Sequence, residues 1–458
     1  MDPLTPWWWL YRIFGGLILF PALVKPVLSS RFGGFWADRL GFNLCAGSRP
    51  VWIHGASVGE SKSALILLEA LRREGFNGPS VISAATPSGL RLLGSKFDRN
   101  LDLNKVMAPP LDFWGAPARF LERMAPSCLI VIETEIWPEL WHQCIKRSIP
   151  IFLISARVSP KAYQRYLRVR FFLASVLGGL TFLAANSHQD LERLISLGAP
   201  PERSEVLGSP KFDLLIEKAK NNLEALNKGV SFKTIFFNDL IDDNLNNDPD
   251  FLVKLNKLFA SQVDSRPLIL AGSTHQEEEK LIIETIKALS PRQFRLVIAP
   301  RHLQRVSEVA LLAYKLNLRA SLLSEVLDRK DPWAQRDTLI IDRLGLLTAL
   351  YARCDIAIVG GSFFSGEGHN PIEPALWGRP IIFGPHTSSF EEIAEGLVTA
   401  GAALRSSPEG LREALLEFLD TPERAFKATS AGLKFVSNLR PIAPLLAKAV
   451  LLRLNKGS

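Results

Sequence analysis

The stretch that decides the fold is residues 128–156, CLIVIETEIWPELWHQCIKRSIPIFLISA. It opens with a continuous apolar run at 128–133, continues through a helix-like segment at 137–147, and closes with a second apolar run at 150–156. A strand that is apolar on both faces is typical of a parallel sheet with helices on either side. The stretch therefore predicts a strand–helix–strand unit whose two strands run parallel.

The same alternation of apolar runs and helical periodicity extends outward from this stretch. Further strand-like segments of the first half lie at 50–57, 79–86, 183–187 and 204–208. The pattern restarts after residue 266, with strand-like segments at 267–273, 294–300, 338–342, 354–360 and 379–384. Two such blocks predict two doubly wound α/β domains, which bind ligands at the carboxyl ends of their strands, in the cleft between the domains.

The domain boundaries follow from these blocks. We expect an N-terminal segment at 1–30, a first domain at 31–220 and a second domain at 267–458. Residues 221–266 have weak periodicity and are rich in Asp and Asn. They predict a linker or a surface insertion between the domains.

The composition agrees with globular domains and excludes several other classes. The chain has 458 residues, of which 47% are hydrophobic and 22% are charged, so it is not a disordered chain. Its net charge of +8 suits anionic partners such as phosphates, nucleotides or an acidic membrane surface. The four cysteines are scattered without a CxxC pair, which argues against a disulfide scaffold and a zinc ribbon.

The N-terminal segment is strongly apolar. Residues 7–28 read WWWLYRIFGGLILFPALVKPVL, a run interrupted by cations and prolines. Its uncharged part, 13–24, is shorter than the roughly 20 residues that a membrane-spanning helix needs. Tryptophan rings beside a cation suit the headgroup level, so we expect a membrane-associated helix that anchors residues 1–30 at the surface. A buried core helix of the first domain is the alternative.

Three carboxylates follow apolar strands of the first domain. In HGASVGES (54–61), Glu60 stands three residues after a serine, so it either caps the coming helix or acts as a general base in the cleft. In IETEIWPELW (132–141), Glu133 and Glu135 follow the buried strand. One of them can cap the next helix while the other enters the cleft, and the residues alone do not decide which.

Basic residues gather at 157–170, which contains Arg and Lys but no acidic residue. This segment is either a solvated helix face or a contact for anionic lipid or phosphate. It carries no recognition motif for nucleic acid. Another cation, Lys211 in GSPKFD, follows a strand of the same domain.

Two short motifs of the second domain predict an anion site. GSTH (272–275) and APRH (299–302) each follow an apolar strand and precede a helix. Small residues let backbone N–H groups approach a phosphate, and Arg301 can form bidentate bonds to it.

The longest motif is GGSFFSGEGHNPIEPALWGRPIIFG (360–384), in which a strand opens into a glycine-rich loop. Asn370, followed by proline, predicts a helix N-terminus that faces phosphate, and Glu373 supplies a carboxylate for ribose hydroxyls. Together they predict a nucleotide-sugar donor site. The chain lacks the dinucleotide and P-loop fingerprints and the H-E-x-x-H spacing, so dehydrogenase, P-loop and catalytic zinc chemistry are not expected.

In this order, the motifs resemble those of the 3-deoxy-D-manno-octulosonic acid (Kdo) transferases of lipopolysaccharide assembly. The resemblance runs nearly end to end, through ASVGE, IETEIWP, GSPKFD, GSTH, PRH and GGS…GHNPIEPALWGRPIIFGPH. It implies the GT-B fold with two Rossmann-like domains. It also implies transfer of Kdo from CMP-Kdo to a lipid A precursor on the cytoplasmic side of the inner membrane, without a bound metal or cofactor.

The resemblance also assigns site residues. It implies that Glu60 is the general base and that Glu133 and Lys211 stabilise the transition state. The CMP contacts that it implies are Pro300, Arg301, Leu344, Gly345, Leu346, Asn370, Pro371, Ile372 and Glu373. Where the family commonly has Gly-Glu, this chain has Gly-Leu at 345–346, so a carboxylate that could contact the nucleotide is missing.

These expectations describe an inverting glycosyl transfer. Glu60 removes a proton from an acceptor hydroxyl, whose oxygen attacks the anomeric carbon of Kdo as CMP leaves. The expected partners are CMP-Kdo, a lipid A precursor and the inner membrane surface, and nucleic acid is not one of them. The alternatives are a GT-B transferase with another nucleotide-sugar donor, and a catalytically silent, membrane-attached sugar-nucleotide binder.

Overall fold

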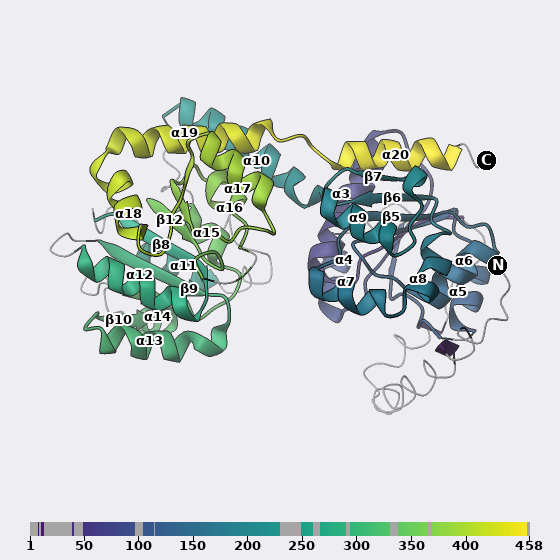
Figure 1. The fold of residues 1–458 in the computed structure, drawn as a ribbon, viewed down its shortest axis with the longest axis horizontal. Coiled ribbons are helices and arrows are strands. Elements are labelled where there is room, and N and C mark those ends of the chain that lie inside the picture. Colours follow the sequence, from purple (N-terminus) through teal and green to yellow (C-terminus); the bar gives the residue numbers. More distant parts are fainter. Residues whose placement is uncertain are drawn as a thin grey trace. The chain divides into compact units, whose positions relative to one another are not determined.

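Two compact units make up the structure, a computed structural model in which Met1–Asp213 and Arg440–Ser458 form the first unit and Leu214–Leu439 the second. The residues that the structure describes are 8, 11, 12, 39, 40, 49–96, 104–113, 115–229, 249–259, 266–289, 294–329, 338–364, 366 and 368–455. Figure 1 shows that each unit is an α/β layer structure with helices packed around a sheet.

The first unit contains a seven-stranded parallel sheet with the order β3-β2-β1-β4-β5-β6-β7. Its strands are β1 (Val51–His54), β2 (Ser80–Ser83), β3 (Asn104–Met107), β4 (Cys128–Ile132), β5 (Ile151–Ala156), β6 (Phe182–Ala185) and β7 (Ser204–Val206). Its helices are α3 (Val58–Arg73), α4 (Pro87–Lys96), α5 (Ala116–Met124), α6 (Pro138–Lys146), α7 (Pro160–Leu167), α8 (Arg170–Leu177), α9 (His188–Ser196), η2 (Pro201–Arg203), η3 (Pro210–Phe212) and α20 (Ala443–Asn455).

The second unit repeats this plan, with a seven-stranded parallel sheet in the order β10-β11-β9-β8-β12-β13-β14. Its strands are β8 (Leu268–Thr274), β9 (Arg295–Pro300), β10 (Ala320–Leu322), β11 (Thr338–Ile340), β12 (Ile356–Val359), β13 (Ile381–Phe383) and β14 (Ala403–Arg405). Its helices are α11 (Pro249–Leu258), α12 (Gln276–Ala288), η6 (Leu303–Arg305), α13 (Val306–Lys315), α14 (Leu323–Arg329), α15 (Leu347–Tyr351), α16 (Ile372–Leu376), α17 (Glu391–Thr399), α18 (Leu411–Asp420) and α19 (Pro422–Asn438), and α10 (Asp213–Asn227) begins at the unit boundary.

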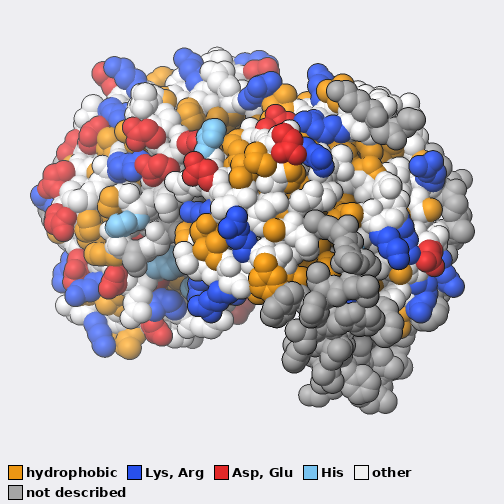
Figure 2. Space-filling view, turned by 45° about the vertical axis from the view of Figure 1, so that its right-hand side comes forward, with side chains coloured by type: hydrophobic (Ala, Val, Ile, Leu, Met, Phe, Trp, Pro, Cys, Tyr) orange, Lys and Arg blue, Asp and Glu red, His pale blue; other side chains and the backbone are white. Residues whose placement is uncertain are grey.

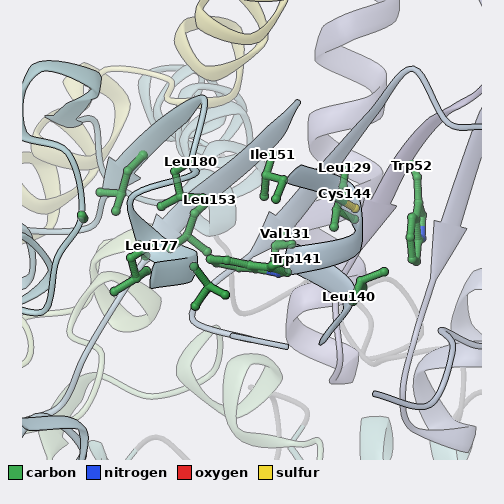
Figure 3. Packing of buried hydrophobic residues seen from close by; sticks show 14 of the residues in the cluster. Trp52, Leu129, Val131, Leu140, Trp141, Cys144, Ile151, Leu153, Leu177 and Leu180 are labelled. Atoms are coloured by element: carbon green, nitrogen blue, oxygen red, sulfur yellow. The ribbon is translucent and has the colours of Figure 1, made fainter. Parts of the chain in front are cut away.

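The strand β4 is buried on both faces, as its continuous apolar run predicts. Leu129 and Val131 belong to a core formed with α5, α6 and α8, whereas Ile130 and Ile132 belong to a core formed with α3 and α20. Figure 3 shows the first of these cores, with Trp141 of α6 beside the side chains of the strands. The two predicted doubly wound sheets are confirmed.

The strands that the sequence does not reveal lie at sheet edges. They are β3, β10 and β14, each an outermost strand of its sheet. An edge strand has a neighbour on one side only and can be short, so it needs no continuous apolar run. Asn104–Met107, with the sequence NKVM, has no such run.

The domain division differs from the one expected at 31–220, 221–266 and 267–458. The C-terminal helix α20 belongs to the first unit, because its apolar side packs into the core beside α3. Asp213 holds the start of this helix by accepting hydrogen bonds from Ile442 N–H (2.9 Å) and Ala443 N–H (2.6 Å).

Part of the expected linker is also regular structure. The helix α10 runs on to Asn227, and Asn222 Nδ2 donates to the backbone oxygen of Leu376 (2.7 Å) within the second unit. The helix α11 buries Phe251 and Leu255. Residues 230–248 and 260–265 lie outside the described residues.

An N-terminal membrane helix is not supported. Most of the segment 1–30 lies outside the described residues, but Trp8 is 5% exposed and packs against Phe172 of α8, with ring centroids 5.0 Å apart. Arg12 forms an ion pair with the buried Glu139 (2.9 Å). The burial of Trp8 and these two contacts with the protein are those of the alternative, a buried core helix of the first domain.

By length and composition, one helical stretch of the described part of the chain could cross a membrane. It is Pro422–Asn455, which comprises α19 and α20 and contains an 18-residue window with a mean hydropathy of 1.3. Leu446 and Val450 of this stretch are fully buried in the core of the first unit. Such burial is typical of a core helix.

Surface charges of both signs are interspersed over much of the face drawn in Figure 2. The Lys and Arg side chains of that face therefore do not form one uniform basic strip.

The double burial of the central strands predicts the effect of a core substitution. We expect Leu153→Ala, at a fully buried position of β5, to lower the free energy of unfolding by about 2–5 kcal/mol, because it removes packed methyl groups and leaves a cavity. The matched control is Leu452→Ala, where the side chain is 61% exposed and the change should stay within about 0.5 kcal/mol. Urea unfolding measures both, and equal losses would contradict the description of this core.

Candidate active site

The candidate residues lie at the point of each sheet where the strand order switches direction, although all strands remain parallel. In the first unit, β1 pairs with β2 on one side and with β4 on the other. In the second unit, β8 pairs with β9 on one side and with β12 on the other. Loops that leave two such neighbouring strands diverge at their carboxyl ends and leave space for a ligand. We describe the group of residues at each of these two points separately.

Glu60 lies in the first turn of α3, directly after β1. Its Oε2 accepts a hydrogen bond from Ala56 N–H (2.6 Å), and its Oε1 accepts one from the Ser57 hydroxyl (2.7 Å). Ser57 in turn caps the helix by accepting from Glu60 N–H (3.3 Å). Of the two alternatives, a helix cap and a general base, the hydrogen bonds of the carboxylate are those of a helix cap. Each of its oxygens retains capacity for one further hydrogen bond, which a substrate hydroxyl can use.

Glu133 and Lys211 form an ion pair at the end of β4. Glu133 has a left-handed backbone conformation (φ +61°), which ends the strand and costs about 1 kcal/mol or more for a residue with a side chain. Lys211 is in η3, which packs against α3, the helix that carries Glu60. The three residues that the resemblance implies for catalysis are thus grouped within one unit.

Glu135 has a different environment from Glu133. Its Oε2 accepts a hydrogen bond from the indole of Trp137 (2.9 Å). Burial raises its pKa, and the negative charges of Glu60 and Glu133 add to this shift. Glu60 follows β1, and Glu133 and Glu135 follow β4, the neighbouring strand in the sheet, so the three carboxylates follow adjacent strand ends.

Neither Glu133 nor Glu135 caps the helix α6. The cap comes from Asp112, whose carboxylate accepts hydrogen bonds from Glu139 N–H (3.2 Å) and Leu140 N–H (2.7 Å). Burial raises the pKa of Asp112 to about 6. Sequence reasoning missed this residue because it lies far before the helix that it caps and no local spacing connects the two.

His54, the last residue of β1, is a second residue whose role the motif did not reveal. Its Nδ1 is 2.9 Å from the Ser83 hydroxyl, and its ring packs edge-on against Trp137. Burial lowers its pKa to about 4. It is therefore a neutral, buried imidazole at neutral pH.

In the second unit, Arg301 and three histidines meet at the ends of β8 and β9. Arg301 N–H donates to the backbone oxygen of Thr274 (3.0 Å). The rings of His275 and His369 are stacked with their Nε2 atoms 3.0 Å apart, and His302 lies edge-on to His275. Burial lowers the pKa of His369 to about 4, and the neighbouring His275 and Arg301 act in the same direction.

The other predicted donor residues lie on the loops beside this group. Asn370 accepts from the N–H of Ile372 (3.0 Å), the first residue of α16, but the N-cap position of this five-residue helix is held by Pro371, one residue later than expected. Glu373 accepts from the hydroxyl of Thr348 (2.8 Å), which joins α16 to α15. Burial raises the pKa of Glu373.

Several of these donor residues can offer only their backbone to a ligand. Pro300, Pro371 and Ile372 are buried. Leu346, which stands where the family commonly has Glu, is 1% exposed and directly precedes α15, whereas Leu344 is 64% exposed. Gly345 has φ +86°, which allows the turn between them. The leucine at 346 thus fills the core.

The start of the glycine-rich loop is occupied by a residue that sequence reasoning missed. Backbone N–H groups of Gly361, Ser362 and Phe363 all donate to the carboxylate of Glu278. These groups are therefore not available to a phosphate. Glu278 stands three residues after His275, and this capping-box spacing is the signal that could have identified it.

Within the described ranges, no group of three or more His, Cys, Asp or Glu side chains could hold a metal ion.

Comparison with known proteins agrees with this arrangement. Residues 34–214 match the family described as 3-Deoxy-D-manno-octulosonic-acid transferase (kdotransferase). The chain is 33% identical to the 3-deoxy-D-manno-octulosonic acid transferase of Bordetella pertussis over 367 residues, which cover 78% of this chain and 76% of the relative. It is 29% identical to the enzyme of the same name from Haemophilus influenzae, over 89% of this chain and 88% of the relative.

Among solved structures, a glycosyltransferase from Rickettsia africae ESF-5 has the same fold, with a TM-score of 0.55 and 12% identity over 90% of this chain and 100% of that chain. The two seven-stranded parallel sheets thus define the GT-B fold. More particularly, the chain belongs to the 3-deoxy-D-manno-octulosonic acid transferase family.

The buried His54 predicts a pH dependence of stability. Its pKa in the folded protein, about 4, lies below the ordinary value of 6.5, so the unfolded chain takes up a proton as the pH falls from 6.5 to 4 while the folded protein does not. At pH 5 this difference costs about 2 kcal/mol. We expect His54→Gln to lose less stability than the wild type between pH 7 and pH 5, measured by urea unfolding at each pH.

The control for this measurement is His188→Gln, because His188 is exposed. It should retain the wild-type pH dependence. A His54→Gln protein that loses as much stability as the wild type would show that His54 is not held neutral.

Proposed function

We propose that the protein transfers Kdo from CMP-Kdo to a hydroxyl group of a lipid A precursor, in lipopolysaccharide core assembly. The observation that carries this proposal is the grouping of Glu60 with the Glu133–Lys211 ion pair at the carboxyl ends of β1 and β4. Membership of the family supports the choice of donor and acceptor.

In the proposed reaction, Glu60 is the general base. It accepts the proton of the acceptor hydroxyl, whose oxygen forms a bond to the anomeric carbon of Kdo. The bond between that carbon and the CMP phosphate oxygen breaks with its electron pair, so that CMP leaves and the configuration inverts. The Ala56 N–H and the Ser57 hydroxyl hold the carboxylate in place before the reaction.

The two other residues of this group act through charge. The ammonium of Lys211 can stabilise negative charge that develops near the reacting centre, and Glu133 orients the ammonium through the ion pair. Both side chains are partly exposed, with Lys211 at 41% and Glu133 at 29%, so a ligand can reach them.

On the donor side, Arg301 is the proposed partner of the CMP phosphate. Its side chain is exposed at the end of β9, and an arginine can bind phosphate through two parallel hydrogen bonds. Glu373 and the loop at 344–346 lie close together through the Thr348 hydrogen bond and are the proposed contacts for the nucleoside.

Direct measurement of transfer tests the proposal. The full chain is incubated with CMP-Kdo and a lipid A precursor, and mass spectrometry of the lipid should show the added Kdo. We expect Glu60→Gln to lower turnover about 10²–10⁴-fold, since it removes the base, while the affinity for CMP stays unchanged. A near-wild-type rate in this variant would exclude Glu60 as the base.

The matched control is Glu69→Gln on the same helix, where the side chain is exposed and pairs with Arg73. It should retain wild-type turnover.

The buried Leu346 bears on the alternative of a different nucleotide-sugar donor, because no carboxylate stands there. Thermal stabilisation by UDP or GDP but not by CMP would favour that alternative over CMP-Kdo.

We also propose that the first unit binds the cytoplasmic face of the inner membrane through α7 and α8. Arg165, Arg168 and Arg170 are exposed there beside two exposed apolar side chains, Val169 (41%) and Phe171 (53%). Trp8 and Tyr11 pack against Phe172 of α8, so the described part of the N-terminal segment lies beside this surface. Exposed cations with apolar neighbours are typical of a surface that binds anionic lipid.

Vesicle binding tests this membrane proposal. We expect Arg165→Glu/Arg168→Glu to weaken binding to vesicles that contain phosphatidylglycerol at least about tenfold, because each cation near an anionic surface contributes about 1 kcal/mol. The control Lys427→Glu/Lys434→Glu makes the same change in net charge on exposed residues of the second unit. Equal weakening by both pairs would contradict a specific surface on α7 and α8.

A further inference from the structure

We propose that Glu278 is a positioning residue, which holds the glycine-rich loop and the His275–His369 pair in the arrangement that receives the donor. This inference rests on the proposed function for the identity of the donor. Its contacts are all within the second unit.

The carboxylate of Glu278 is surrounded by hydrogen-bond donors. Its Oε2 accepts from Gly361 N–H (2.7 Å) and His275 N–H (3.0 Å). Its Oε1 accepts from Ser362 N–H (2.8 Å) and Phe363 N–H (3.0 Å). The residue is 2% exposed. Four backbone donors around one buried carboxylate form the kind of anion site that phosphate occupies in other proteins, and here the chain fills it with its own side chain.

These bonds connect two loops that the sheet alone does not join. The residues Gly361, Ser362 and Phe363 follow β12, whereas His275 and Glu278 follow β8. Although β8 and β12 are neighbouring strands, their pairing ends at Gly272 and Val359. Beyond that point the carboxylate is the bridge that fixes the loop against the start of α12.

Gly361 also connects Glu278 to the segment that contains the predicted donor residues. Gly361 accepts from Gly368 N–H (2.9 Å) and lies against the ring of His369, where an added Cβ would be 2.7 Å from Cδ2. The His369 ring meets the His275 ring through their Nε2 atoms. Glu278 thus fixes both ends of the histidine pair, and Asn370, a predicted CMP contact, follows His369 directly in the chain.

Glu279, the neighbouring carboxylate, shows that this role is specific to one position. It is fully buried but faces the other way, where it pairs with Arg305 (2.6 Å) and accepts from the Thr274 hydroxyl (3.3 Å). Of the two, only Glu278 accepts from the loop among the contacts of the described residues.

Exchange of the carboxylate for an amide disrupts this arrangement in either orientation. The amide nitrogen of glutamine donates and does not accept, so it must face two backbone N–H groups that also donate. We therefore expect Glu278→Gln to release the loop. Gly361→Ala should disturb the same loop with the carboxylate intact, because the glycine has φ +72° and its added Cβ would collide with His369.

The first test needs no donor. Hydrogen exchange of the full chain, read by mass spectrometry, should show slow exchange of the amides at 361–363 in the wild type and exchange at least about tenfold faster in Glu278→Gln. The matched control is Glu139→Gln, which removes a fully buried, paired carboxylate from the first unit. Unchanged exchange at 361–363 in Glu278→Gln would overturn the proposal, whatever the donor is.

The second test separates positioning from general loss of stability. With CMP-Kdo as donor, Glu278→Gln and Gly361→Ala should each raise KM for the donor about tenfold or more, with kcat at saturating donor within about threefold of the wild type. Because both act on one loop, the double variant should be little worse than either single variant. Glu139→Gln should keep the wild-type KM.

The outcomes distinguish this inference from the proposed function. If the wild type does not use CMP-Kdo, the proposed function fails, and the exchange measurement still tests Glu278. If the wild type uses CMP-Kdo and Glu278→Gln keeps the wild-type KM, the positioning role is wrong.

Discussion

Parallel strand pairing is the constraint on which the rest of the structure depends. It brings all carboxyl ends of a sheet to one edge, where helix N-termini and loop amides need acceptors. In both units the chain supplies a glutamate as the third residue of the helix after the first strand. These are Glu60 in α3 and Glu278 in α12. In both units, therefore, a glutamate of the first helical turn accepts a hydrogen bond from a backbone N–H group just after the first strand.

The two glutamates differ in how fully the protein uses them. Glu278 accepts four backbone hydrogen bonds and reaches across to the loop after β12, so it fixes structure. Among the contacts of the described residues, the carboxylate of Glu60 accepts two hydrogen bonds, both from its own turn, and it lies near the charged pair of Glu133 and Lys211. Glu60 can accept further hydrogen bonds and is therefore suited to the proton transfer that we propose. Glu278 already accepts four hydrogen bonds and is suited to holding the loop.

Much of this could be predicted from the sequence where burial is strong and spacing is local. The apolar run at 128–133 predicts a strand buried on both faces. Asn370 predicts the start of α16, where its side chain accepts a hydrogen bond from Ile372 N–H. Features that depend on distant contacts could not be predicted. Asp112 caps α6 from another loop, and α20 returns to the first unit. The choice between Glu133 and Glu135 likewise needed the resemblance, because alternation along the strand ends at the left-handed Glu133.

The central claim is that the second unit holds the nucleotide at the carboxyl edge of its sheet, independently of Glu60 in the first unit. Hydrogen exchange of the full wild-type chain with and without CMP tests it most directly. The account predicts that CMP slows exchange in the segments 300–302 and 368–373 and leaves β1 and the first turn of α3 unchanged. Slower exchange confined to the first unit, with no change in those two segments, would contradict it.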